Sequence, residues 1–137
     1  MQTKVTWLNG CFDVLHAGHI QLFKKAWEQG NDVIVGIDSD ERIRQMKGDC
    51  RPVNSLENRM LFLQSIKYIR AVIPFNTDEE LNANIKRLQP EVFVIGEEYR
   101  DKVIIGKEWA KAMLYVPRFQ GLSSSSIING THKSWYL

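Results

Sequence analysis

One uninterrupted apolar stretch, DVIVGID at Asp32–Asp38, limits the folds open to this chain more than any other feature. Its β-branched residues do not alternate with polar ones, which is typical of a strand buried on both faces of a parallel sheet. Other short runs of this kind predict further strands. The segments between them show helical spacing, as over Ala17–Gln29, where Gly30 ends the pattern.

Predicted strands and helices alternate along the chain at short spacing. The predicted strands are Val5–Leu8, Asp32–Asp38, Ala71–Phe75, Glu91–Gly96 and Met113–Val116. The predicted helices are Ala17–Gln29, Asp40–Gln45, a helix capped by Ser55 that runs through Ile66, one from a Thr77–Glu80 capping box to about Leu88, and segments at Gly106–Lys111 and Ser123–Asn129. This order predicts an α/β fold, a doubly wound parallel sheet of about five strands with helices on both faces.

Length and composition narrow the function classes. The 137 residues are expected to form a single domain, with 132–137 as a flexible tail. A net charge of +2 does not argue for a nucleic-acid partner, and no segment approaches the roughly 20 apolar residues that span a bilayer. Two cysteines without metal-type spacing, and an N-terminus without a signal-peptide pattern, favour the cytoplasm.

Two histidines, His16 and His19, stand where the first predicted strand leads into the first helix. In such sheets ligands bind outside the carboxyl ends of the strands, where the strand order reverses. A helix N-terminus offers free N–H groups, and Gly10 and Gly18 allow a ligand to approach the backbone. The segment therefore predicts a phosphate cradle with imidazole donors. The alternative is two partly exposed histidines at a loop, one of which serves as a cap. A zinc site lacks further ligands at suitable spacing.

The stretch NGCFDVLHAGH at Asn9–His19 resembles the H-x-G-H signature of the nucleotidyltransferase superfamily, and the likeness extends from Lys4 to about Ile128. Within this superfamily the chain resembles two families most, the heptose 1-phosphate adenylyltransferases and the glycerol-3-phosphate cytidylyltransferases. The resemblance implies a Rossmann-like fold. It also implies a reaction in which a substrate phosphate attacks the α-phosphate of a nucleoside triphosphate and pyrophosphate leaves, by positioning and electrostatics without a covalent intermediate.

The resemblance also implies roles for individual residues. His16, His19 and Lys47 would be the catalytic groups; Lys47 lies in MKGDCRPVN, which is similar to the heptose-type K-G-D-x-R-P-V-N. The nucleotide-binding residues would be Gly10, Cys11, Phe12, Gly18, Gly96, Glu97, Arg118, Gly121, Ser123, Ser124 and Ser125. The candidates for binding the acceptor substrate are Asp13, Asp40, Arg51 and Arg59.

Several of these roles have open alternatives. Asp13 would order its loop or contact a magnesium ion bound with the triphosphate, and a plain turn carboxylate is the other interpretation. Arg59 would bind a substrate phosphate, or pair with Glu57 or Glu98. The serine tract Ser123–Ser126 would open a helix at the triphosphate, or form a capping turn.

The expected function is a magnesium-dependent nucleotidyltransferase that acts on a sugar or polyol phosphate. KGDCRPVN and GKEW favour ATP with a heptose 1-phosphate-like acceptor, whereas Arg118 favours CTP with glycerol 3-phosphate. A nucleotide-binding module without turnover is the rival from another class, and the intact His16, His19 and Lys47 argue against it. The resemblance alone suggests a homodimer, and neither nucleic acid nor a membrane is an expected partner.

Overall fold

In the computed structural model, which describes residues 4–117, five parallel strands form one sheet in the order β3-β2-β1-β4-β5. The strands are β1 (Val5–Gly10), β2 (Asp32–Asp38), β3 (Ala71–Phe75), β4 (Val92–Gly96) and β5 (Ala112–Val116). The chain builds outward from β1 to β3 and then returns to place β4 on the other side of β1. The order therefore reverses between β1 and β4, and the predicted Rossmann-like α/β fold is confirmed.

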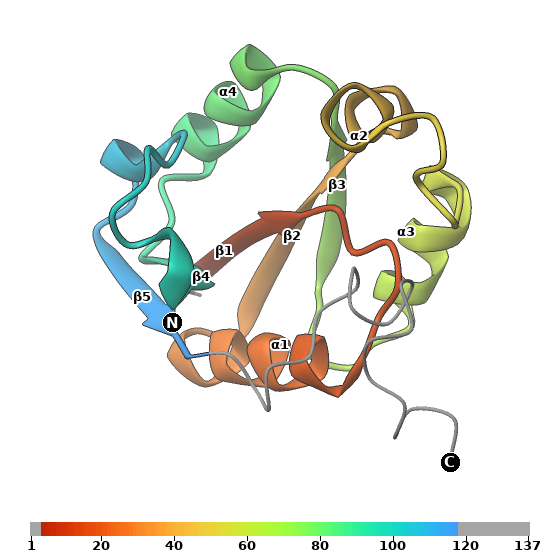
Figure 1. Cartoon of the computed structure of the whole chain (residues 1–137). Coiled ribbons are helices and arrows are strands. Elements are labelled where there is room, and N and C mark those ends of the chain that lie inside the picture. The colour runs from red at the N-terminus through yellow and green to blue at the C-terminus, as the bar shows by residue number, and fades with distance from the viewer. Residues whose placement is uncertain (1–3, 118–137) are drawn as a thin grey trace.

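Helices cover both faces of this sheet (Figure 1). They are α1 (Ala17–Gln29), α2 (Asp40–Lys47), α3 (Leu56–Gln64) and α4 (Asp78–Leu88), with short 3-10 turns η1 (Glu97–Tyr99) and η2 (Lys107–Trp109). On one face α1 and α3 pack on a core that includes Leu8, Phe23, Val33, Val35, Leu63 and Val94. On the other, α4 packs on a core that includes Trp7, Ile34, Leu81, Ile85 and Phe93. Neighbouring strand residues alternate between the two cores, as the pleat requires.

Most predicted elements are found, with differences at their ends. Ser55 and Thr77 cap α3 and α4 by accepting from Asn58 N (3.3 Å) and Glu80 N (3.1 Å). The Glu80 carboxylate, however, accepts from Asn76 N, one residue before the cap, so the predicted capping box is only half formed. The helix expected over Gly106–Lys111 is a single 3-10 turn, and the one expected over Ser123–Asn129 lies outside the described residues.

Two glycines are required by the backbone and the packing. A Cβ on Gly36 in β2 would lie 2.5 Å from the Trp7 ring, so only glycine lets this indole lie against the sheet. Gly48 ends α2 with φ 94°, a region that favours glycine, and its N–H donates to Arg44 O at 2.8 Å. The chain therefore turns sharply directly after Lys47, which is the last residue of α2.

The amino and carboxyl ends of the strands differ in how the chain is held there. At the amino ends, backbone hydrogen bonds tie neighbouring strands together, for example Glu91 N to Val5 O (2.9 Å) and Ala112 N to Glu91 O (3.0 Å). At the carboxyl ends the chain leaves the sheet in loops and helix starts that carry the predicted site. Among residues 4–117, no helix is long and apolar enough to cross a membrane.

Candidate active site

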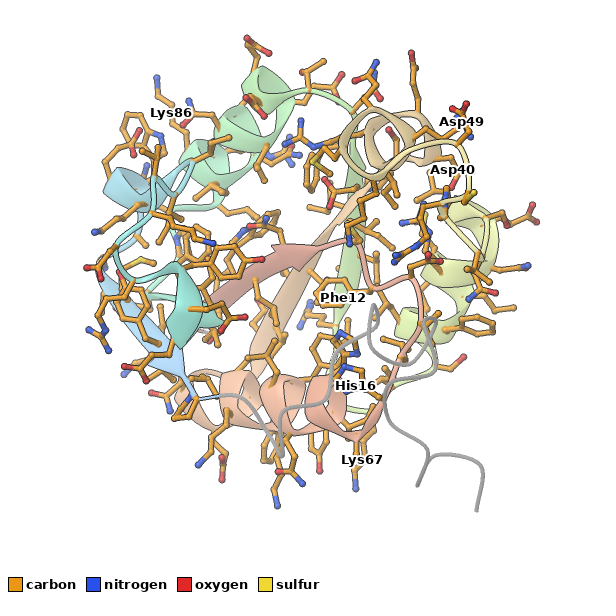
Figure 2. All side chains as sticks on the ribbon, in the orientation of Figure 1. Phe12, His16, Asp40, Asp49, Lys67 and Lys86 are labelled. Atoms are coloured by element: carbon orange, nitrogen blue, oxygen red, sulfur yellow. The ribbon has the colours of Figure 1, made fainter. Side chains whose placement is uncertain are left out.

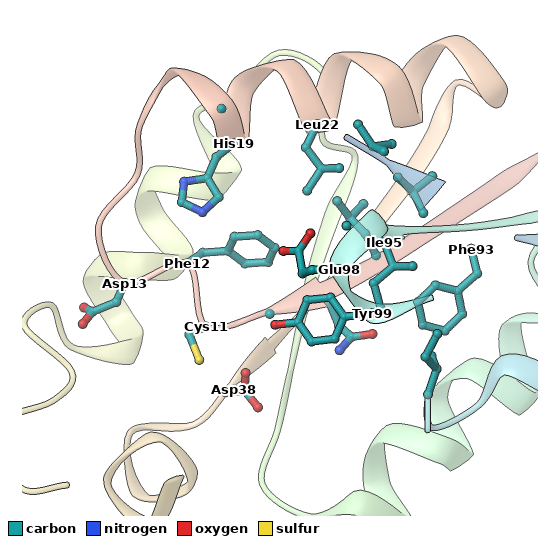
Figure 3. A pocket seen from close by; sticks show the side chains of 18 of the residues that line it. Cys11, Phe12, Asp13, His19, Leu22, Asp38, Phe93, Ile95, Glu98 and Tyr99 are labelled. Carbon is teal, nitrogen blue, oxygen red and sulfur yellow. The ribbon is translucent and has the colours of Figure 1, made fainter. Parts of the chain in front are cut away.

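A cavity of about 700 Å³ opens at the carboxyl ends of the strands, beside the point between β1 and β4 where the strand order reverses (Figure 3). β1 and the loop after it, the start of α1, the end of β2, α2 and the β4–η1 segment all contribute to its walls. The predicted site residues that line it are Gly10, Cys11, Phe12, Asp13, His16, Gly18, His19, Lys47, Arg51 and Gly96. The structure thus brings together residues that lie far apart in the sequence.

His16 and His19 hold each other at the start of α1. His16 is the N-cap, and its Nδ1 accepts from Gly18 N (3.0 Å); the Nδ1 of His19 accepts from His16 N (3.1 Å). The two rings lie 3.9 Å apart. Both histidines therefore cap the helix, where the alternative interpretation had only one as a cap, and His16 already accepts from the Gly18 N–H at the helix start. The imidazoles themselves line the cavity and can bind a ligand.

Both imidazoles are neutral near pH 7. Burial lowers the pKa of His16, and burial together with the charge of His16 lowers the pKa of His19 to about 3. Because Nδ1 accepts a hydrogen bond in each ring, the proton of the neutral ring is on Nε2. Each ring therefore offers one Nε2–H donor beside the cavity. Phe12 holds His19 in place by an edge-on ring contact at 5.6 Å.

The lowered histidine pKa values predict a stability change in mild acid. The unfolded imidazole titrates near 6.5 and the folded His19 near 3, so the unfolded chain binds more protons between these values. The contribution of His19 to the free energy of unfolding should be fully present above pH 6.5. Below that pH it should fall by up to about 1.4 kcal/mol per pH unit. Urea unfolding at pH 7, 6 and 5 measures this dependence.

A matched variant isolates the histidine contribution. His19→Gln keeps an acceptor for His16 N but does not titrate, so its stability should vary less between pH 7 and 5. An equal pH dependence in both proteins would contradict the lowered pKa of His19.

Asp13 fastens the loop after α2 to the loop before α1. This residue is 1% exposed, and its carboxylate accepts from Val53 N (2.8 Å), Asn54 N (2.9 Å) and Arg51 Nε (2.8 Å). Burial raises the pKa of Asp13, but the hydrogen bonds from Asn54, Val53 and Arg51 outweigh it and leave the pKa below its usual value. Of the predicted roles, the structure shows the ordering of the loop.

Arg59 has a different role from the predicted contact with substrate. Its side chain is fully buried and does not line the cavity. The guanidinium donates to the backbone oxygens of Asn54 (3.0 Å), Cys11 (3.0 Å) and Asp38 (2.7 Å), and to the Asp40 carboxylate (2.6 Å). Arg59 therefore pairs with Asp40 and with neither Glu57 nor Glu98. Asp40, also predicted to bind substrate, lies outside the cavity wall and holds this arginine.

The region after β4 is divided between the cavity and solvent. Gly96 and Glu98 line the cavity, whereas the predicted Glu97 lies outside its wall and pairs with Arg100 at 3.3 Å. Figure 3 shows Glu98 and Tyr99 extending over the cavity beside Phe12. The remaining predictions, Arg118, Gly121, Ser123, Ser124 and Ser125, lie outside the described residues.

Sequence reasoning missed two charged residues in the wall, Asp38 and Arg42. Asp38 ends β2 and Arg42 follows one helical turn later, and Arg42 Nε donates to the Asp38 carboxylate at 2.7 Å. The same carboxylate is hydrogen-bonded to Cys11; burial first, and the Asp38 charge next, raise the pKa of the Cys11 thiol to about 11. A signal was available, because Asp38 is the last residue of a predicted strand and ligands bind at such ends.

Comparison with known proteins agrees with this geometry. The family model described as cytidylyltransferase-like matches residues 7–130. Curated relatives include Bifunctional protein HldE of Helicobacter hepaticus, 39% identical over 133 residues that make up 97% of this chain and 27% of that protein. The protein of the same name from Campylobacter concisus is 36% identical over 125 residues, 91% of this chain and 26% of that one. The chain thus spans about a quarter of the length of these relatives.

Solved structures share the fold at low identity. A lipopolysaccharide core biosynthesis protein from Thermoplasma volcanium has a TM-score of 0.66 at 19% identity, over 89% of this chain and 100% of that one. A bifunctional NMN adenylyltransferase/ADP ribose pyrophosphatase from Francisella tularensis has a TM-score of 0.65 at 16% identity, over 97% of this chain and 43% of that one. These likenesses establish the arrangement of the strands and helices only.

Proposed function

The chain belongs to the cytidylyltransferase-like family of nucleotidyltransferases, and we propose that it transfers a nucleoside monophosphate from a nucleoside triphosphate to a sugar or polyol phosphate. An oxygen of the acceptor phosphate attacks the α-phosphorus. The bond from that phosphorus to the bridging oxygen breaks, and pyrophosphate leaves with the electron pair. The negative charge that builds up on the phosphoryl oxygens must be met by fixed donors.

The arrangement of His16 and His19 is the observation that carries this proposal. Each Nδ1 atom already accepts a backbone hydrogen bond at the start of α1, so the rings are fixed before any ligand binds. Donors that need no reorganisation stabilise developing charge best. As neutral imidazoles they bind phosphate oxygens without depending on protonation, and Lys47 in the same wall supplies a full positive charge.

For the substrates, we favour ATP with a heptose 1-phosphate-like acceptor. The segment that resembles the heptose-type motif, Lys47–Asn54, contributes Lys47 and Arg51 to the cavity wall, and Asp13 holds its last residues in place. CTP with glycerol 3-phosphate is the alternative, favoured by Arg118. The resemblance also leads us to propose a homodimer.

The magnesium ion expected from the resemblance fits Asp13 poorly, because Arg51 Nε, Val53 N and Asn54 N already occupy three of about four acceptor positions of this buried carboxylate. Within residues 4–117 there is also no group of three or more His, Cys, Asp or Glu side chains placed to hold a metal. Any magnesium ion would accordingly be carried by the phosphates of the nucleotide, and the roles proposed for the histidines and Lys47 do not depend on it.

Pyrophosphate release tests the function directly. Each of ATP and CTP is combined with a panel of sugar and polyol phosphates that includes heptose 1-phosphate and glycerol 3-phosphate. Release that requires both a triphosphate and an acceptor supports the transferase, and the best pair identifies base and acceptor together. Tight triphosphate binding without release for any acceptor would support the silent nucleotide-binding module instead.

Lys47→Ala should raise the KM for the triphosphate and lower turnover, each by roughly tenfold or more, since hydrogen bonds to charged groups are the strong ones. The Lys47 charge is close enough to influence the Cys11 thiol inside the cavity. Steady-state kinetics measure the effect. Lys67→Ala is the control, because Figure 2 places Lys67 on the outside of the molecule and it does not line the cavity. Unchanged kinetics in Lys47→Ala would make Lys47 a solvated lysine.

A further inference from the structure

The cavity wall has two chemically different ends. Toward β4 and β5 it is mostly apolar and includes Phe93, Ile95, Ile104 and Val116, with Glu98 near them. Toward β2 and α2 its wall is charged and includes Asp38, Arg42 and Lys47. Figure 3 shows Asp38 beside Cys11 on one side and Phe93 and Ile95 on the other. We call these the apolar end and the charged end.

The two substrates of a nucleotidyltransferase make different demands on such walls. A planar base is bound by apolar and aromatic side chains, whereas a polyhydroxylated molecule needs hydrogen-bonding partners. The reacting phosphates join the two substrates, and His16 and His19 lie in the wall of the same cavity. The charged end therefore matches the acceptor, and the apolar end matches the base.

Asp38 is the acidic group of the charged end, and its surroundings hold it in place. Its side chain is 8% exposed. One carboxylate oxygen accepts from Arg42 Nε at 2.7 Å, and the Cys11 thiol is also bonded to the carboxylate. A carboxylate has about four positions for hydrogen bonds, so it retains acceptor capacity for a group in the cavity.

Arg42 is in turn fixed from outside the cavity. Its Nη2 donates to the Asp78 carboxylate at the start of α4 (2.7 Å), and its guanidinium lies over the Phe75 ring at 5.1 Å. The bridge from Asp38 through Arg42 to Asp78 joins β2, α2 and α4. Asp38 is therefore a rigid acceptor, which is the property that recognition of hydroxyl groups requires.

We propose that Asp38 is a specificity-determining residue that accepts hydrogen bonds from hydroxyl groups of the acceptor and disfavours acceptors with a second negative charge at the charged end. This inference rests on the proposed transferase function. Like charges placed together in a desolvated site are costly, so a carboxylate excludes an additional phosphate while it binds neutral hydroxyls.

The test is kinetic and uses Asp38→Asn, which keeps the shape of the side chain and removes its charge. The substrates are the best sugar monophosphate from the panel and the corresponding bisphosphate. We expect the KM for the monophosphate to rise roughly tenfold, the preference for monophosphate over bisphosphate to fall at least tenfold, and triphosphate affinity in calorimetry to stay within about twofold.

Asp32→Asn is the matched control. It also removes a carboxylate that pairs with an arginine, Arg70 at 2.9 Å, but it lies at the start of β2 and outside the cavity wall, so acceptor KM and preference should match wild type. The inference is overturned if Asp38→Asn leaves acceptor KM and preference unchanged, if it weakens triphosphate binding as strongly as acceptor binding, or if Asp32→Asn reproduces its effect. If the wild-type chain turns over no phosphorylated acceptor, the proposed function fails and this inference fails with it.

Discussion

Replacing His16 with alanine should lower turnover by on the order of a hundredfold to a thousandfold, because a fixed donor to the transition state is lost. His19→Ala should show a loss of similar size. Both rings line the cavity, and each keeps an Nε2–H available for a phosphate oxygen. Pyrophosphate release under saturating substrates measures the change.

The helix cap made by His16 requires a control, because alanine also removes the acceptor for Gly18 N. That loss should cost about 1 kcal/mol of stability. Asparagine is among the best N-cap residues, so His16→Asn should keep the free energy of unfolding near that of wild type and still lose the rate. Near-normal pyrophosphate release by His16→Asn would show that His16 is only a cap.

Arg59→Met should lower the free energy of unfolding by roughly 3–5 kcal/mol, a large part of the stability of a typical domain. Methionine fills a similar volume but leaves the backbone oxygens of Cys11, Asn54 and Asp38 without their donor in a buried region. Each such group costs about 1–3 kcal/mol when it is unsatisfied. Urea denaturation followed by circular dichroism measures the loss.

Arg70→Met is the matched control for this variant. Arg70 also pairs with an aspartate, Asp32 at 2.9 Å, but its side chain is 67% exposed. An exposed ion pair contributes up to about 1 kcal/mol, so this variant should remain close to wild type. Similar losses in both variants would mean that the contacts of Arg59 do not stabilise the fold.

The elements that sequence predicted best are those fixed by local pattern. The strands Asp32–Asp38 and Ala71–Phe75 and the helix Ala17–Gln29 have the predicted bounds, because continuous apolar runs and helical spacing act within a few residues. The helix predicted over Gly106–Lys111 is present only as the 3-10 turn Lys107–Trp109, with Gly106 as its N-cap at φ 83°. The chain becomes extended again at Ala110, and the Trp109 indole donates to Asn82 of α4 at 3.0 Å.

The predictions for the site residues also succeeded where the pattern is local and failed where the contacts are distant in sequence. The histidine pair was visible because its spacing and its position after a strand are local facts. The role of Arg59 was not, because its acceptors include the backbone of Cys11, 48 residues away, and backbone oxygens leave no trace in the residue pattern. Asp13 is similar, since its carboxylate bonds to the N–H groups of Val53 and Asn54, 40 and 41 residues further along.

The different roles of the two ends of the strands affect how readily such a protein can acquire new substrates. Backbone hydrogen bonds join neighbouring strands at their amino ends, whereas the cavity is formed at their carboxyl ends. Substitutions at exposed wall residues such as Met46 and Val103 can therefore reshape the cavity without disturbing those hydrogen bonds. Asp40 and Arg59, in contrast, hold the loops at the carboxyl ends in place, so changes there would alter stability together with the site. The acceptor preference is thus an evolvable trait at the exposed part of the wall.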